Sequence, residues 1–234
     1  MTTFTYTDGD TICDGYVAVP SGAGPHPAVL IAHNWAGQTV ADNGVADRLA
    51  ALGYIGIAID VYGDGVRGDP MGDNSALMGP WMADRAALQR RLLAAVTAAA
   101  AHPAVDADRI AIIGYCFGGL CALDVARSAT PHIKAAVSFH GVYAPTGLAA
   151  QPITAKVLVL NGWDDPMAPP AATVALATEL TAAGADWQIH AYGGTMHAFT
   201  APGANNPAGG VMYNADADRR SWQAMTNFLG DVFA

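Results

Sequence analysis

IAIIGYCFGG, residues 110–119, joins an apolar, β-branched run to a helical pattern through a cysteine flanked by glycines. The run Ile110–Tyr115 predicts a buried strand, and Phe117–Ser128 predicts a helix that begins directly after it. Cys116 therefore lies at a sharp strand-to-helix turn, which pushes its side chain out at the end of the strand. Such a turn leaves no room for neighbouring Cβ atoms, which explains the glycines on both sides.

This turn gives Cys116 the surroundings of a nucleophile. The N-terminus of the following helix offers free backbone N–H groups and a dipole that favours negative charge, so it can stabilise a thiolate and an oxyanion. A buried structural cysteine is the alternative, because free cysteines often behave as small apolar side chains. The combination of strand, turn and helix favours the nucleophile.

Strands and helices alternate along the rest of the chain. Strands are predicted at Gly15–Val19, Ala28–Ala32, Tyr54–Asp60, Ala135–Phe139, Lys156–Asn161 and Trp187–Tyr192. Helices are predicted at Val40–Leu52, Ser75–Ala101, Pro170–Ala183 and Arg219–Phe233, and loops at Tyr62–Asn74 and Ala201–Asn214. Most strand runs are continuously apolar, as is typical of strands covered on both faces. The sequence thus predicts one α/β domain over residues 1–234, with a mainly parallel sheet of about seven to eight strands and helices on both faces.

Two later segments offer the base and the carboxylate that a catalytic thiol needs. His197 follows the strand that ends at Tyr192, and both Asp164 and Asp165 follow the strand that ends at Asn161. The order nucleophile, Asp, His is that of the α/β-hydrolase fold, so the sequence predicts this fold and a triad. From the residues alone either aspartate can serve, because an adjacent carboxylate often caps a turn.

The loop after the early strand Ala28–Ala32 is expected to supply an oxyanion donor. The backbone N–H groups of Trp35 and Phe117 are the candidate pair. His33 and His140 also follow strands, and both are interpreted as structural histidines near the pocket. The side chains that can line this pocket, although a core position is equally consistent with most of them, are Asn34, Trp81, Met82, Tyr143 and Phe199.

The composition argues against several other classes of protein. The net charge of −9 is unsuited to nucleic acid, which is bound by clustered Lys and Arg. No apolar run approaches the roughly 20 residues that cross a bilayer, so no membrane partner is expected. Metal-ligand clusters, a Walker loop and a complete dinucleotide fingerprint are missing from the sequence, so neither metal nor cofactor is expected. Three cysteines favour a reducing, cytoplasmic location over a disulfide framework.

The sequence resembles the dienelactone hydrolase family over nearly its whole length. The resemblance rests on GYCFGG at 114–119, NGWDDPMAPP at 161–170 and YGGTMHAF at 192–199. It implies an α/β-hydrolase with a Cys–His–Asp triad and no cofactor, which is a monomer or a weak homodimer in the cytoplasm. The spacing of the family motif selects Asp165 as the carboxylate of the triad.

Two positions depart from the family members that cleave dienelactone. Those members carry a Glu that contacts the thiol where this chain has Asn34, and an Arg that holds the substrate carboxylate where it has Ala201. The arginines that could replace this clamp are interpreted as charges on a solvated or helical surface: Arg67, Arg85, Arg90 and Arg91. The resemblance therefore supports the triad and leaves the natural substrate open.

Together these features predict a hydrolase of small carboxylic esters or lactones that works through an acyl-thioester on Cys116. Two alternatives stay open. One is a thioesterase or another acyl hydrolase with the same triad, and the other is a non-catalytic binding protein with a hydrolase-like fold. The intact set of Cys116, Asp165 and His197 argues against the binding protein.

Overall fold

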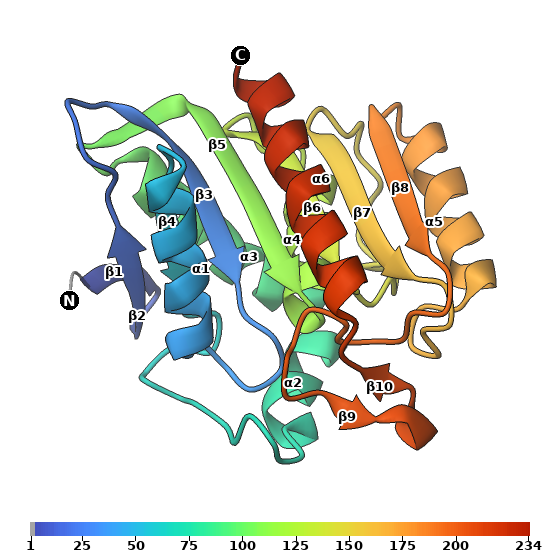
Figure 1. Ribbon diagram of the computed structural model, residues 1–234. Helices are drawn as coiled ribbons and strands as arrows, with labels where there is room; N and C mark the ends of the chain where they lie inside the picture. Colours follow the sequence, from blue (N-terminus) through green and yellow to red (C-terminus); the bar gives the residue numbers. More distant parts are fainter. Residues whose placement is uncertain (1–2) are drawn as a thin grey trace.

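The centre of the computed structural model, which describes residues 3–234, is an eight-stranded sheet in the order β1-β2-β4-β3-β5-β6-β7-β8 (Figure 1). Strands β3 to β8 run parallel, whereas β2 is antiparallel to both of its neighbours. The strands are β1 Thr3–Asp8, β2 Thr11–Ala18, β3 His26–Ala32, β4 Ile55–Ile59, β5 Val105–Tyr115, β6 Ile133–Phe139, β7 Lys156–Gly162 and β8 Trp187–Tyr192. This sheet confirms the predicted α/β class and its mainly parallel strands.

Helices cover both faces of the sheet (Figure 1). One face carries α1 and α6, and the opposite face carries α3, α4 and α5. The helices are α1 Val40–Ala51, α2 Ser75–Ala83, α3 Arg85–Ala100, α4 Phe117–Arg127, α5 Pro170–Ala182 and α6 Ala215–Phe233. A short hairpin of β9 (Asn205–Asn206) and β10 (Val211–Met212) follows β8, with a 3-10 turn at Pro207–Gly209 between its strands. None of the helices within residues 3–234 combines the length and apolar character needed to span a bilayer.

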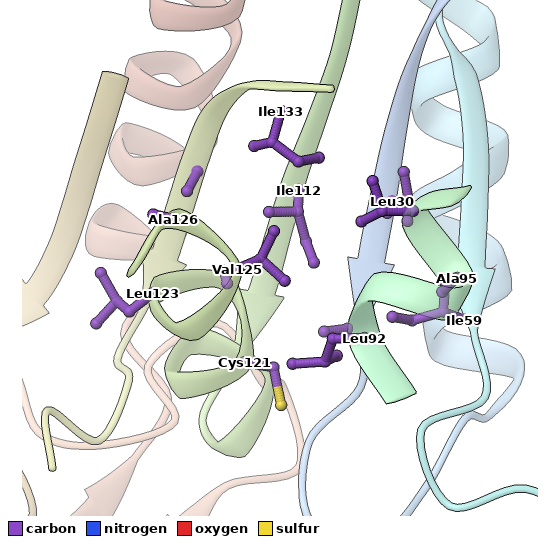
Figure 2. Packing of buried hydrophobic residues seen from close by; sticks show 14 of the residues in the cluster. Leu30, Ile59, Leu92, Ala95, Ile112, Cys121, Leu123, Val125, Ala126 and Ile133 are labelled. Atoms are coloured by element: carbon purple, nitrogen blue, oxygen red, sulfur yellow. The ribbon is translucent and has the colours of Figure 1, made fainter. Parts of the chain in front are cut away.

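Interlocking apolar side chains fix α4 against the central strands (Figure 2). Cys121 and Val125 project from α4 into the same buried cluster as Ile112 of β5 and Ile133 of β6. Burial of each large aliphatic side chain contributes roughly 1.5–3 kcal/mol, so the helix is held firmly along its length. The turn between β5 and α4 is therefore fixed by packing on both of its sides.

The N-terminal hairpin is the part of the sheet that the sequence patterns miss. β1 was not predicted, and the strand predicted at Gly15–Val19 begins earlier, at Thr11. β1 reads TFTYTD and buries only alternate residues, because it is an edge strand with one face toward the core. Three threonines on its exposed side hide this strand from a search for continuously apolar runs.

The long helix predicted at Ser75–Ala101 is two helices, so that prediction was wrong. Asp84 adopts an extended backbone, with φ −119° and ψ 82°, and its carboxylate caps α3 by accepting a hydrogen bond of 2.9 Å from the Ala87 N–H. The apolar period continues through this break and conceals it. Pro80 and the capping position of Asp84 were the available signals of a boundary.

Candidate active site

Cys116 occupies the turn between β5 and α4, with φ 58° and ψ −114°. A positive φ is costly for a residue with a Cβ atom, so the backbone is strained at this point. A Cβ atom on Gly114 would collide with the Gly118 carbonyl oxygen, and one on Gly118 would collide with the Ala32 carbonyl oxygen. The glycines around Cys116 are thus required by close backbone contact, as the sequence predicts. The thiol is partly exposed.

Asp165 and His197 meet at the carboxyl ends of β7 and β8. The His197 Nδ1–H donates to Asp165 Oδ2 over 2.8 Å, and Asp165 Oδ1 accepts a bond of 2.8 Å from the Met167 N–H. Both side chains are almost completely buried, with exposed fractions of 1% for Asp165 and 3% for His197. Asp164 is exposed instead, and its backbone N–H donates to the Thr195 carbonyl. The structure therefore brings Asp165, and not Asp164, to the histidine.

The segment after His197 holds its backbone in place. The His197 N–H donates to the Gly210 carbonyl over 2.9 Å, and the His197 carbonyl accepts from the Met212 N–H over 3.1 Å. These partners flank or belong to β10, so the stretch Ala201–Asn214 is more than the loop predicted from its composition. The small hairpin therefore fixes the position of the His197 backbone, and with it the imidazole, at the carboxyl end of the sheet.

The free side of the His197 ring faces the thiol. Nε2 is buried and has no hydrogen-bond partner among residues 3–234, and the Cys116 side chain is its ionisable neighbour. Burial alone would lower the pKa of His197, but the hydrogen bond to Asp165 and the adjacent Cys116 sulfur raise this pKa to about 10. These contacts favour the protonated form of the ring beside the sulfur.

In the part of the chain that the structure describes, two backbone N–H groups near the turn are free to bind an oxyanion: that of Phe117, at the start of α4, and that of Trp35, in the loop after β3. Among the hydrogen bonds of residues 3–234, neither the Trp35 N–H nor the Phe117 N–H acts as a donor. Asn34 Oδ1 accepts a bond of 2.8 Å from the Ala36 N–H, so its side chain shapes this loop. The Tyr62 hydroxyl donates to the Trp35 carbonyl over 2.8 Å and ties the loop to the end of β4.

His33 and His140 both make structural contacts. His33 Nδ1–H donates to the Asn34 carbonyl over 2.6 Å, and its Nε2 accepts from the Val61 N–H over 3.1 Å. Burial lowers the pKa of both histidines, and it does so strongly for His140. The His140 ring packs edge-on against the His197 ring, with centroids 5.1 Å apart. His33 thus joins two loops, and His140 supports the imidazole from behind.

The candidate pocket side chains fall into two groups. Trp81 and Met82 are half-buried on α2 and pack against the cluster that Cys116 also contacts, and Tyr143 is buried in this cluster. Phe199 is completely buried in the other cluster, on the opposite face of the sheet. It packs against His140 and Tyr192, so the suggestion that Phe199 lines a pocket was wrong. Its position two residues after His197 could not reveal this direction.

The interpretation of the arginines was wrong for two of the four. Arg85 is 6% exposed and pairs with Asp124 at 2.6 Å, and Arg91 is 5% exposed and pairs with Asp8 at 2.9 Å. Arg90 is largely exposed, as expected, and Arg67 pairs with the buried Asp60. The local sequence around Arg85 and Arg91 does not reveal their carboxylate partners, which come from distant parts of the chain.

Tyr62 holds the loop that carries Trp35, and Tyr62→Phe tests whether it positions this loop. Loss of the hydroxyl removes the bond to Trp35, so we expect a stability loss of about 1 kcal/mol. We also expect kcat to fall roughly 3- to 10-fold with KM unchanged, because a displaced donor weakens the transition state selectively. Tyr16→Phe is the matched control, since it removes an exposed bond to Asp47. Equal kcat in both variants would show that Tyr62 does not position the loop.

Comparisons with known proteins give one family model and several relatives of similar sequence or structure. A model of the dienelactone hydrolase family matches residues 13–233, a range that includes all three predicted triad residues. Uncharacterized protein K02A2.1 of Caenorhabditis elegans is 36% identical over 150 residues, which cover 63% of this chain and 95% of that protein. The "Putative carboxymethylenebutenolidase" of Synechocystis sp. (strain ATCC 27184 / PCC 6803 / Kazusa) is 27% identical over 223 residues, which cover 89% and 87%. The crystal structure of the dienelactone hydrolase-like promiscuous phosphotriesterase P91 from metagenomic libraries aligns with a TM-score of 0.89 and 34% identity, over 99% of this chain and 97% of that one.

Proposed function

The chain belongs to the dienelactone hydrolase family and is a hydrolase of ester or lactone bonds, and we propose that it works through an acyl-thioester on Cys116. His197 is the proposed acid and base, and Asp165 is the proposed orienting carboxylate. The observation that carries this proposal is the bond of 2.8 Å between His197 Nδ1 and Asp165 Oδ2, with Nε2 free beside the thiol.

In the first half-reaction the Cys116 thiolate attacks the carbonyl carbon, and a C–S bond forms. The carbonyl oxygen becomes an oxyanion, which the Trp35 and Phe117 N–H groups stabilise by about 3 kcal/mol each. The C–O bond to the leaving group then breaks, and the departing oxygen takes the Nε2 proton of the His197 imidazolium. This leaves an acyl-thioester and a neutral imidazole.

In the second half-reaction the neutral His197 removes a proton from water, and the hydroxide oxygen attacks the thioester carbonyl. The C–S bond breaks, the acid leaves, and the thiolate and imidazolium are restored. Asp165 holds the ring in the tautomer that this cycle needs and stabilises each imidazolium. The raised pKa of His197 supports activation of the thiol without a Glu at the position of Asn34.

Intact-mass analysis after brief exposure to activated esters, lactones, thioesters and a phosphotriester tests this function. We expect a transient mass gain equal to the acyl group in the wild type and none in Cys116→Ala. A panel of this kind also separates ester hydrolysis from thioesterase activity by rate. A folded wild type with no adduct and no turnover on any substrate would contradict the proposal and favour the binding protein.

A further inference from the structure

Every cationic side chain of the sequence has a partner in the structure. The chain contains 11 Lys and Arg in total, all within residues 3–234. Arg48 stacks on the Trp222 ring at 3.5 Å, and Lys134 donates to the Pro131 carbonyl. The others all form ion pairs with carboxylates: Arg67, Arg85, Arg90, Arg91, Arg109, Arg127, Lys156, Arg219 and Arg220.

Arg67 and Arg91 each bond to several protein groups. Arg91 pairs with Asp8 and also donates to the Val61 and Tyr62 carbonyls, directly after β4. Arg67 bonds to Asp60 and to Gln38. Withdrawal of either guanidinium toward a ligand would leave a carboxylate unpaired, and for the fully buried Asp60 this is expensive. These groups are therefore structural and unavailable to a substrate.

The wall of the site on this side is apolar. Helix α2 has the sequence SALMGPWMA and carries no charged residue. It lies at the carboxyl edge of the sheet (Figure 1), and its half-buried side chains pack against the cluster that Cys116 and Tyr143 also join. The chain as a whole carries a net charge of −9, which disfavours the approach of a further anion.

We infer that the acyl site, with α2 as its apolar wall, accepts uncharged acyl groups and rejects those that end in a carboxylate. This inference rests on the proposed function of Cys116. A carboxylate that entered beside α2 would lose its hydration without a free cation in exchange, because the guanidinium that stacks on this helix, Arg91 at 5.0 Å from the Trp81 ring centroid, is already paired with Asp8. An aliphatic chain would gain by covering Trp81 and Met82. The charge of the acyl group, more than its length, then sets the specificity.

A matched pair of substrates tests this inference on the wild-type protein. Mono-4-nitrophenyl adipate carries a free carboxylate, and methyl 4-nitrophenyl adipate masks the same group as an ester. We expect kcat/KM for the charged compound to be lower by about 100-fold or more at neutral pH, because its carboxylate is buried without a partner. A ratio within about threefold would overturn the inference while the proposed function stands. Absence of turnover and of a mass adduct with both would instead overturn the proposed function.

A charge introduced on α2 provides the second measurement. Met82→Lys should raise kcat/KM for the charged ester relative to its methyl ester by about tenfold, since the new cation pairs with the carboxylate. Met78→Lys on the same helix is the second variant, in case Met82→Lys does not fold. Leu52→Lys is the matched control, because it adds the same charge at the exposed end of α1. Folded α2 variants that discriminate as strongly as the control would overturn the assignment of α2 as the wall.

Discussion

Cys116→Ala is expected to lower kcat for an activated ester by about 10⁵-fold or more while the protein stays folded. The substitution removes the atom that forms the proposed acyl bond, and no other group can replace it. Cys121 lies on the next turns of α4, but it is completely buried and its pKa is raised by burial. Steady-state kinetics with 4-nitrophenyl esters measures the loss. A variant that keeps more than about 1% of the activity would place the nucleophile elsewhere.

A comparison of Cys116→Ala with Cys116→Gly separates strain from chemistry. Both variants lack the thiol, so both should be equally inactive. The φ of 58° at this position is unfavourable for alanine and free of cost for glycine. We therefore expect Cys116→Gly to be the more stable of the two by about 1 kcal/mol, even though glycine loses more entropy on folding. Urea unfolding measures the difference, and a less stable glycine variant would show that the turn is not strained.

The turn around Cys116 could be predicted because its sequence signal is local, even though one of its glycines is also required by a distant strand. A strand, a cysteine and three glycines within ten residues specify a tight turn, and the contact of Gly114 with Gly118 lies inside this stretch, whereas Gly118 also meets the Ala32 carbonyl of β3. The order of Asp165 and His197 along the chain follows from the topology, since both come after strands of the same parallel sheet. These parts of the site needed no knowledge of long-range packing.

Features that depend on distant partners could not be predicted from local pattern. The residues alone leave the choice between Asp164 and Asp165 open. Backbone contacts decide it: the Met167 N–H donates to the Asp165 carboxylate, which points inward, whereas the Asp164 N–H donates to the Thr195 carbonyl and its side chain stays exposed. Arg85 is buried because it pairs with Asp124, which lies 39 residues later in the chain. Phe199 is likewise placed by a partner far away in the chain, because its ring packs against that of His140. In each case the contact joins elements that the sequence separates.

Asp165→Asn is expected to lower kcat by about 10³- to 10⁴-fold, because the amide can present its N–H₂ group and hold His197 in the wrong tautomer. Asp164→Asn is the matched control. It makes the same chemical change one residue away, on an exposed side chain that makes no contact with the imidazole. We expect the control to keep kcat within about twofold. A larger loss in Asp164→Asn than in Asp165→Asn would reverse the assignment.

The pKa of His197 gives the same substitution a second, non-kinetic measure. Its hydrogen bond to Asp165 helps to raise this pKa to about 10, so Asp165→Asn must lower it, and imidazole resonances followed by NMR will report the change. Because the pKa of His197 is higher in the folded protein than its unfolded value of about 6.5, protonation of this ring stabilises the fold. This stabilisation is fully present below about pH 6.5 and is lost as the pH rises toward 10. The wild type should therefore be more stable than Asp165→Asn near pH 6, with a gap that narrows by pH 10. A gap that widens with pH would mean that His197 is neutral in the resting enzyme, and the thiol would then need another source of activation.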